Sequence, residues 1–155
     1  MASTSAAGVQ SRPTRWGCAE EGAAKHGTTV DRRNWRVLMA WHIAETREQA
    51  RNEAVLGLQR WNNDYNADVL GRPDAKRVED PWELLDQITG QGAAGAGAAV
   101  VGTPADLIAA IRDLQERTGG FGAVLGFAHD WANSEPTPRS WDLVAPSAMP
   151  LTRGN

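Results

Sequence analysis

The sequence has little of several features that would indicate a particular class of protein. Its 155 residues include one cysteine, Cys18, so an intrachain disulfide is excluded and a reducing cytoplasm is the expected compartment. No run of about 18 apolar residues is present, so we expect no membrane span, and residues 1–15 lack the apolar core of a signal peptide. Lys and Arg number 16 against 19 Asp and Glu, so no basic excess favours nucleic acid.

Tyrosine and phenylalanine are also scarce, whereas tryptophan is abundant. One Tyr and two Phe accompany seven Trp. Each Trp needs a large apolar surface and a partner for its indole N–H, so seven of them indicate a packed interior or a partner surface beyond the chain's own core. The chain is 41% hydrophobic and 23% charged, with a formal charge of −3. These totals are typical of one ordinary soluble domain, which at this length buries about two-thirds of its extended surface.

Hydrophobic spacing predicts helices that alternate with strands. We expect a helix over 16–26, a strand over 35–43, a helix over 46–65, a polar excursion over 67–80, a short helix over 80–88, a helix over 103–118, a strand after Gly120, and a last helix over 134–149. Residues 1–14 are predicted to be a flexible leader, residues 15–151 a single domain, and residues 152–155 a tail.

Local signals mark several helix ends. Thr46 and Gln49 have the spacing of a capping box, in which the threonine accepts from the third amide and the glutamine reaches back to the cap. Thr103 precedes a proline and an acidic residue, as a helix start does. Asn62, Asn63 and Asn66 are expected to end the helix that begins at Thr46.

Residues 90–97 contain a literal GxGxxG, which invites the prediction of a dinucleotide-binding loop. That fingerprint needs a strand directly before it and a helix directly after it. Here a helix precedes and a short apolar segment follows. We therefore interpret residues 90–97 as a flexible loop.

The stretch over 118–133, TGGFGAVLGFAHDWAN, presents the clearest candidates for chemistry. Two glycines end a helix, an apolar run too short for a buried helix follows, and the run ends on His129, Asp130 and Trp131. Together with residues 35–43 it makes two convincing strands in a βα alternation, which predicts a parallel sheet covered by helices. Two strands cannot form a closed sheet, so the units are expected to be part of something larger.

Three segments of the sequence resemble one known family. WHIAETREQAR, VGTPADLIAAIRDLQERTGGFGAVLGFAHDWAN and the closing helix that ends in AMP are similar to the C-terminal part of the bacterial-luciferase-like flavin-dependent monooxygenases, most of all to their limonene 1,2-monooxygenase-like subgroup. The resemblance implies an α/β fold that is the C-terminal portion of a (β/α)₈ barrel. Such a barrel takes about 250 residues, so the chain would be a fragment or truncated gene product with the last two βα units and a helical excursion.

The same resemblance implies an activity. Members of the family use reduced FMN (FMNH₂) and O₂ to oxygenate a small apolar organic molecule. The subgroup resemblance implies a terpene such as limonene as the substrate. The reduced flavin would come from a separate flavin reductase that consumes NAD(P)H. Expected partners are the substrate, the reductase, and a second copy or another chain that supplies missing strands; neither nucleic acid nor membrane is expected.

The candidate site residues follow from the position of active sites in barrels, at the carboxyl ends of the strands. His42, His129 and Asp130 are the catalytic candidates, and Trp131 is the candidate for flavin contact. Each has a structural alternative: His42 as a strand histidine satisfied by a neighbour, Asp130 as a cap on the following loop, and Trp131 as packing. No metal site is expected, because the three histidines are scattered.

Two readings of the function remain open. The first is an enzyme, a flavin-dependent monooxygenase represented by its C-terminal region. The second is a non-catalytic fragment or interaction remnant, which the absence of the earlier strands favours for the isolated chain.

Overall fold

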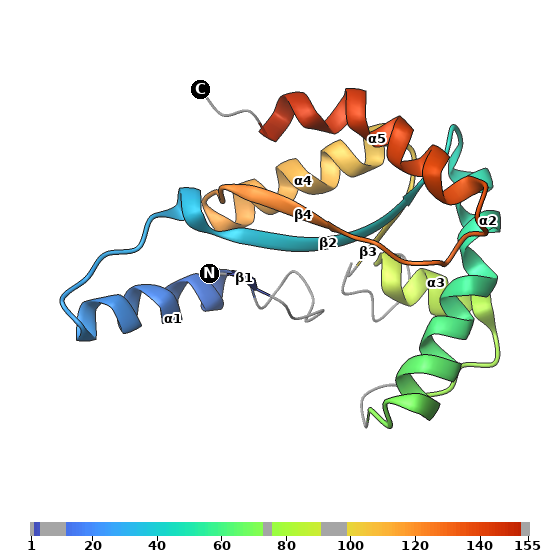
Figure 1. Cartoon of the computed structure of the whole chain (residues 1–155), viewed down its shortest axis with the longest axis horizontal. Helices are drawn as coiled ribbons and strands as arrows, with labels where there is room; N and C mark the ends of the chain where they lie inside the picture. Colours follow the sequence, from blue (N-terminus) through green and yellow to red (C-terminus); the bar gives the residue numbers. More distant parts are fainter. Residues whose placement is uncertain (1, 4–11, 73–75, 91–98, 153–155) are drawn as a thin grey trace.

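The computed structural model of the 155-residue chain describes residues 2–3, 12–72, 76–90 and 99–152. In chain order the elements are β1 (Ala2–Ser3), α1 (Arg12–Lys25), the 3-10 helix η2 (Arg32–Asn34), β2 (Arg36–Ile43), α2 (Arg47–Arg60), the π-helix η3 (Trp61–Val69), α3 (Pro81–Thr89), β3 (Ala99–Gly102), α4 (Pro104–Thr118), β4 (Ala123–Phe127) and α5 (Pro136–Thr152). The expected α/β alternation is therefore present (Figure 1). No described helix is long and apolar enough to cross a membrane.

A parallel sheet with β2 at its centre organises the fold. Ala40 of β2 pairs with Ala99 of β3 and with Phe127 of β4, so β3 and β4 lie on opposite edges of β2. β1 pairs with Arg36 and Val37 of β2, along the same edge of β2 as β3. The two strands predicted from the sequence, β2 and β4, are thus direct neighbours. The prediction of only two strands was wrong, because β1 and β3 are too short to show a period of their own.

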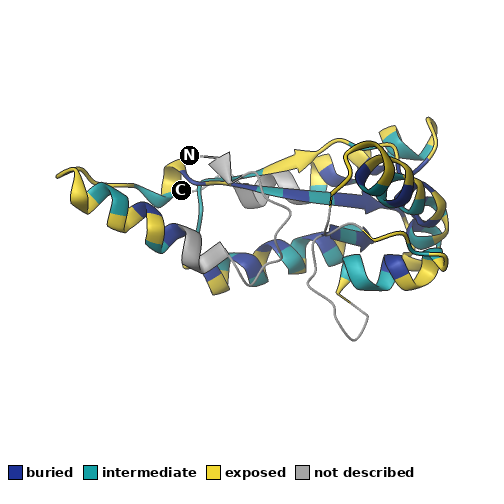
Figure 2. Cartoon of the chain, turned by 90° about the horizontal axis from the view of Figure 1, so that it is seen from below, coloured by how far each residue is buried: buried dark blue, intermediate teal, exposed yellow. Residues whose placement is uncertain are grey.

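β2 is covered on both faces, as its nearly continuous apolar sequence predicts. Figure 2 shows how much of β2 is buried, and its successive side chains point to opposite faces: Val37, Met39, Trp41 and Ile43 belong to one core cluster, and Ala40 packs against the other. One cluster lies between β2 and helices α4 and α5; its buried members are Trp16, Trp35, Val37, Met39, Trp41, Ile43, Leu107, Ile111, Leu114 and Val144. The other lies between the sheet and helices α2 and α3; its buried members are Ala44, Ala50, Ala54, Val55, Leu58, Leu84, Leu85, Ala99, Val101 and Trp131.

The predicted helix starts are mostly confirmed. The Thr103 hydroxyl accepts from the Asp106 amide while the Asp106 carboxylate accepts from the Thr103 amide, so α4 has a complete capping box. The Thr46 hydroxyl accepts from the Gln49 amide at 3.1 Å. The Gln49 side chain does not reach back to the cap, however; it donates to Glu53 at 3.0 Å, because a buried carboxylate one turn on is the stronger acceptor.

The predicted end of the long helix was wrong. The asparagines do not stop it near Tyr65; the helix continues to Val69 as a π-helix. The Leu70 amide donates to the Tyr65 carbonyl at 2.9 Å, a step of five residues. Asn63 hydrogen-bonds the backbone of Val78, outside the helix, and Asn66 donates to the Trp61 carbonyl inside it; the helix continues past both.

Two predictions concern segments that lie wholly or mainly outside the described residues. Of the leader, residues 1 and 4–11 are outside; residues 2–3 form β1, and α1 already begins at Arg12. Of the glycine loop, residues 91–98 are outside. Gly90 is described and ends α3 with φ of 79°, as a glycine helix stop does.

Candidate functional site

The loop that follows β4 passes against the C-terminal half of α2. A close backbone contact fixes their separation: a Cβ on Gly57 would lie 1.9 Å from the Trp131 carbonyl oxygen. Only a glycine permits such an approach. The contact places the end of β4 beside α2 and η3 and so determines where a pocket can form.

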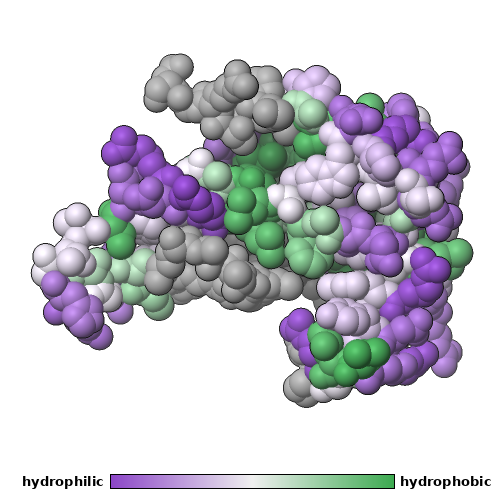
Figure 3. All heavy atoms as spheres, in the orientation of Figure 1, coloured by the Kyte–Doolittle hydropathy of each residue, from purple (hydrophilic) through white to green (hydrophobic). Residues whose placement is uncertain are grey.

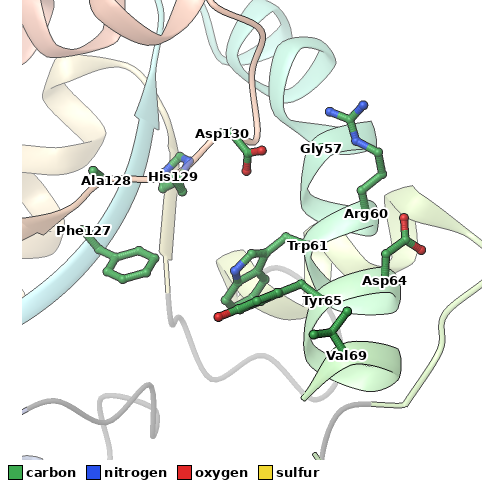
Figure 4. A pocket seen from close by; sticks show the side chains of 10 residues that line it. All are labelled: Gly57, Arg60, Trp61, Asp64, Tyr65, Val69, Phe127, Ala128, His129 and Asp130. Carbon is green, nitrogen blue, oxygen red and sulfur yellow. The ribbon is translucent and has the colours of Figure 1, made fainter. Parts of the chain in front are cut away.

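A pocket of about 500 Å³ lies between these two parts of the chain. Residues of α2 and η3 between Gly57 and Val69 line one side, and residues 127–130 line the other (Figure 4). The volume is within the range of small-molecule sites, about 300–1,000 Å³. Its place at the carboxyl end of a parallel strand is where ligands bind in α/β proteins.

Aromatic rings face the pocket from both sides. Trp61 and Tyr65 project from η3, and Phe127 projects from the end of β4 toward them (Figure 4). Tyr65 is 49% exposed and Phe127 39% exposed, so both rings present open faces. The lining also holds one cation, Arg60, and two carboxylates, Asp64 and Asp130. The arrangement suits a flat, apolar molecule.

His129 lies at the pocket with both ring nitrogens occupied by protein. Nε2 is 2.9 Å from the Trp41 carbonyl oxygen, which can only accept, so Nε2 carries the proton. Nδ1 accepts from the Trp131 amide at 3.3 Å. The ring also stacks on Trp131, with centroids 3.6 Å apart. These contacts select the neutral Nε2–H tautomer, and they tie the loop after β4 to β2.

We predict that His129 titrates far below an ordinary histidine. Burial lowers its pKa to about 4, against the favourable effect of the Trp41 carbonyl, and His42 nearby lowers it further. The folded-state pKa lies below the unfolded value near 6.5, so unfolding takes up a proton between these pH values and stability falls as pH drops from about 6.5 to 4. Histidine NMR titration should give this pKa.

The control for that titration is His129→Gln, in which this contribution to the pH dependence should disappear between pH 4 and 6.5. All other titratable groups are common to both proteins, so the difference between the two stability curves isolates His129. A His129 pKa near 6.5 would contradict the bonded, neutral imidazole.

His42 lies apart from the pocket lining, in a polar cluster between α2 and α5. It is 1% exposed, and its Nε2 is 2.8 Å from Glu53 Oε2. The other oxygen of Glu53 accepts from Arg139 and from Gln49. Burial disfavours the charged form of Glu53, but the hydrogen bonds from His42, Arg139 and Gln49 outweigh it and lower its pKa. The geometry matches the structural alternative for His42, a strand histidine satisfied by a neighbour.

The other two candidates differ in position. Asp130 is exposed and lines the pocket beside His129. Trp131 is 3% exposed and does not line it; its ring packs against His129 and, at 6.0 Å between centroids, edge-on against Trp61. Its indole Nε1 has no hydrogen-bond partner among the described residues. Trp131 therefore supports the pocket wall from behind, the packing alternative.

Sequence reasoning missed the helical half of the pocket. Gly57, Trp61, Tyr65 and Val69 recur every four residues, which places them on one face of the helix. That aromatic spacing was a readable signal. It was passed over because the segment was interpreted as a helix end. Among the described residues no group of three or more potential ligands could hold a metal ion.

Comparison with known proteins gives close matches over nearly the whole chain. No protein-family model matches. The chain is 36% identical over 147 residues to 4-hydroxyprotoasukamycin monooxygenase of Streptomyces nodosus subsp. asukaensis, and 37% identical over 155 residues to limonene 1,2-monooxygenase of Rhodococcus erythropolis. These alignments cover 95% and 100% of the chain. It spans 38% of the length of each of these relatives.

A solved structure shares the fold. It is the oxygenating constituent of 3,6-diketocamphane monooxygenase from Pseudomonas putida, a type II Baeyer–Villiger monooxygenase in complex with FMN. The TM-score is 0.62 at 23% identity, over 93% of this chain and 40% of that one. The chain is therefore a homologue of part of two monooxygenases and shares its fold with an FMN-bound Baeyer–Villiger monooxygenase, in agreement with the resemblance in its sequence.

Proposed function

We propose that this chain is a portion of a flavin-dependent monooxygenase that uses FMNH₂ and O₂ to oxygenate a small apolar molecule, such as a terpene. The observation that carries the proposal is the 36% and 37% identity, over nearly all of the chain, to two monooxygenases. A flavin reductase consuming NAD(P)H would supply FMNH₂. The compartment we propose is the cytoplasm.

The described residues of the pocket fit a flavin in part. Trp61, Tyr65 and Phe127 offer aromatic surfaces for a flat ring system, whereas a phosphate would meet one cation, Arg60, beside the carboxylates Asp64 and Asp130. Reduced FMN supplies the electrons that activate O₂. The chain's own contribution would be to bind, to orient and to exclude water: the aromatic walls shield the ring, while neutral His129 holds the wall to β2. A catalytic role for His129, Asp130 or His42 remains a prediction.

The sheet supports a barrel portion as the architecture of the whole protein. β1, β2 and β4 are parallel, and β1 and β4 pair with opposite edges of β2; parallel strands joined through helices are the units of a (β/α)₈ barrel. β3 pairs with the C-terminal half of β2, on the same edge of β2 where β1 pairs with its N-terminal end. We propose that these strands are the C-terminal part of such a barrel.

A second candidate is favoured by the edge of the sheet. Among the described residues β4 pairs with β2 alone. Leu125 and Phe127 on β4 are 43% and 39% exposed. On the face of the molecule drawn in Figure 3, hydrophobic side chains gather over β4, near the middle. An uncovered apolar edge strand pairs readily with another chain. The chain would then act only with a polypeptide that supplies further strands, or not at all as an enzyme.

An FMN titration tests the proposal. One sample is the chain alone; the other is the chain co-expressed with the part of Rhodococcus erythropolis limonene 1,2-monooxygenase that does not align with it. Saturable quenching of flavin fluorescence is expected, weakened by Tyr65→Ala because a ring of the wall is lost. Binding in the co-expressed sample alone would favour the second candidate. Cooperatively folded protein with no binding in either sample would refute the proposal.

A further inference from the structure

The helical segment that forms one wall of the pocket carries a second stripe of polar residues away from it. Gln59, Asn62, Asn63 and Asn66 recur at three- and four-residue spacing, and we call them the amide stripe. None of them lines the pocket. Three of them, Gln59, Asn62 and Asn63, hydrogen-bond the backbone segment that comes after η3 and hold it against the helix.

Asn63 makes the central contact of the amide stripe. It is 7% exposed. Its Nδ2 donates to the Val78 carbonyl at 2.9 Å, and its Oδ1 accepts from the Val78 amide at 3.0 Å. The side-chain amide thus pairs with one peptide unit in both directions. Loss of the side chain would leave the Val78 amide without this acceptor and the Val78 carbonyl with Gln59 as its remaining side-chain donor.

The other members of the stripe extend this attachment. Gln59 Nε2 donates to the Val78 and Glu79 carbonyls at 3.1 and 2.8 Å. Asn62 Nδ2 donates to the Lys76 carbonyl at 2.8 Å. Residues 76–79 therefore run as a strap along the helix, held by the amide stripe and by the ion pair of Arg77 with Asp68.

Asn66 acts within the helix. Its Nδ2 donates to the Trp61 carbonyl at 2.9 Å, five residues back. Over the π-helical turns, amide side chains therefore hydrogen-bond both to backbone outside the helix and to a carbonyl within it. π-helical turns are rare and are frequent at functional sites.

We propose that the amide stripe, with Asn63 as the main positioning residue, keeps residues 61–69 π-helical and thereby aims the aromatic wall at the pocket. The ligand class rests on the function proposed above. A return to α-helical steps would rotate Tyr65 by tens of degrees relative to Trp61, since the two helices differ in residues per turn. The wall would then no longer face Phe127 (Figure 4).

The only tyrosine of the chain makes this measurable. Because Tyr65 is unique, 3-fluorotyrosine labelling gives one ¹⁹F resonance that reports on the wall without any ligand. In Asn63→Leu, which has a similar size but no amide, the resonance should shift toward the urea-unfolded value or split. Asn63→Asp keeps the acceptor for the Val78 amide and loses the donor, so a smaller shift is expected.

The control variant is Arg32→Ala. The Arg32 guanidinium lies 4.7 Å from the Trp16 ring and donates to the carbonyls of Thr118 and Gly120, outside the pocket. It should lower stability without moving the Tyr65 resonance. An equal shift in both variants, or an unchanged resonance in folded Asn63→Leu, would overturn the proposal. If Asn63→Leu does not fold, the same comparison is made with Asn63→Asp.

FMN titration of the same proteins gives the second readout. In Asn63→Leu the dissociation constant should rise about tenfold, since a misplaced wall loses contacts with a ring, while Arg32→Ala should bind like the wild type. A wild-type chain that binds no FMN would count against the proposed function only. The ¹⁹F comparison would still decide whether the amide stripe positions Tyr65.

Discussion

Replacing Gly57 with alanine is expected to lower the free energy of unfolding by about 3 kcal/mol or more, at the upper end of what overpacking costs. The new Cβ would lie 1.9 Å from the carbonyl oxygen of Trp131 and 2.5 Å from its carbonyl carbon. Those atoms are backbone, so no side chain can turn aside. The helix and the loop after β4 would have to separate.

The same change should weaken any ligand of the pocket. Gly57 and residues 128–130 line it from opposite sides, so a separation at this contact widens it. Urea unfolding followed by tryptophan fluorescence gives the stability, and FMN titration gives the affinity. Both should fall together in Gly57→Ala.

Gly22→Ala is the matched control. Gly22 is also inside a helix, α1, but a Cβ there meets no atom within 4 Å. Alanine is the better helix former, so this variant should gain about 0.5–1 kcal/mol. The same substitution is thus expected to have opposite signs at the two sites. A gain at Gly57 as well would show that the close backbone approach is wrong.

Replacing Glu53 with alanine is expected to cost about 3 kcal/mol. The change leaves His42, which is 1% exposed, without its carboxylate partner and removes the acceptor of Arg139. Breaking a buried charged cluster by removing one member is among the costliest single changes, at about 3–5 kcal/mol, and the 17% exposure of Glu53 places the expected value at the lower end.

A glutamine at this position separates charge from shape. Glu53→Gln keeps one acceptor and should lose about half as much as alanine. Because the folded-state pKa of Glu53 is lowered, the carboxylate stabilises the fold above its ordinary pKa, and that stabilisation disappears as pH falls through the folded value. The free energies of unfolding of wild type and Glu53→Gln, measured in urea, should therefore converge as the pH falls below the ordinary carboxyl range.

Glu48→Gln serves as the control for Glu53. Glu48 is exposed in the first turn of the same helix, where its interaction with the helix dipole contributes about 0.3–1 kcal/mol. Its loss should be correspondingly small. A Glu53→Gln variant that behaved like Glu48→Gln would show that the cluster with His42 and Arg139 does not contribute to stability.

Features that depend on neighbours in sequence were predictable. The caps at Thr46, Asp80 and Thr103 each bind an amide two or three residues away, and the glycine stop at Gly119 has the positive φ of 72° that its residue type favours. Such interactions form within one turn of helix, so residue types at fixed spacing suffice to predict them.

Features that join distant segments were not predictable in the same way. The strand β3 has four residues, too few to show a periodicity, and it is defined by pairing with β2. The π-helical turns of η3 depend on the strap at residues 76–79, which Gln59 and Asn63 hold. An asparagine in isolation favours ending a helix; backbone from another segment reversed that preference.

The candidate site shows the same difference between features set by neighbouring residues and features set by distant segments. The sequence by itself determined the alternation of helices and strands, the strand whose following loop carries His129 and Asp130, and the resemblance to monooxygenases, because short-range spacing and matching residues are enough for each. Only the tertiary structure decided that His42 belongs to a cluster with Glu53, that His129 is bonded at both nitrogens, and that Tyr65 faces Phe127. Those relations depend on how closely helix α2 approaches the loop after β4, and that distance is set by backbone contact between residues far apart in the chain.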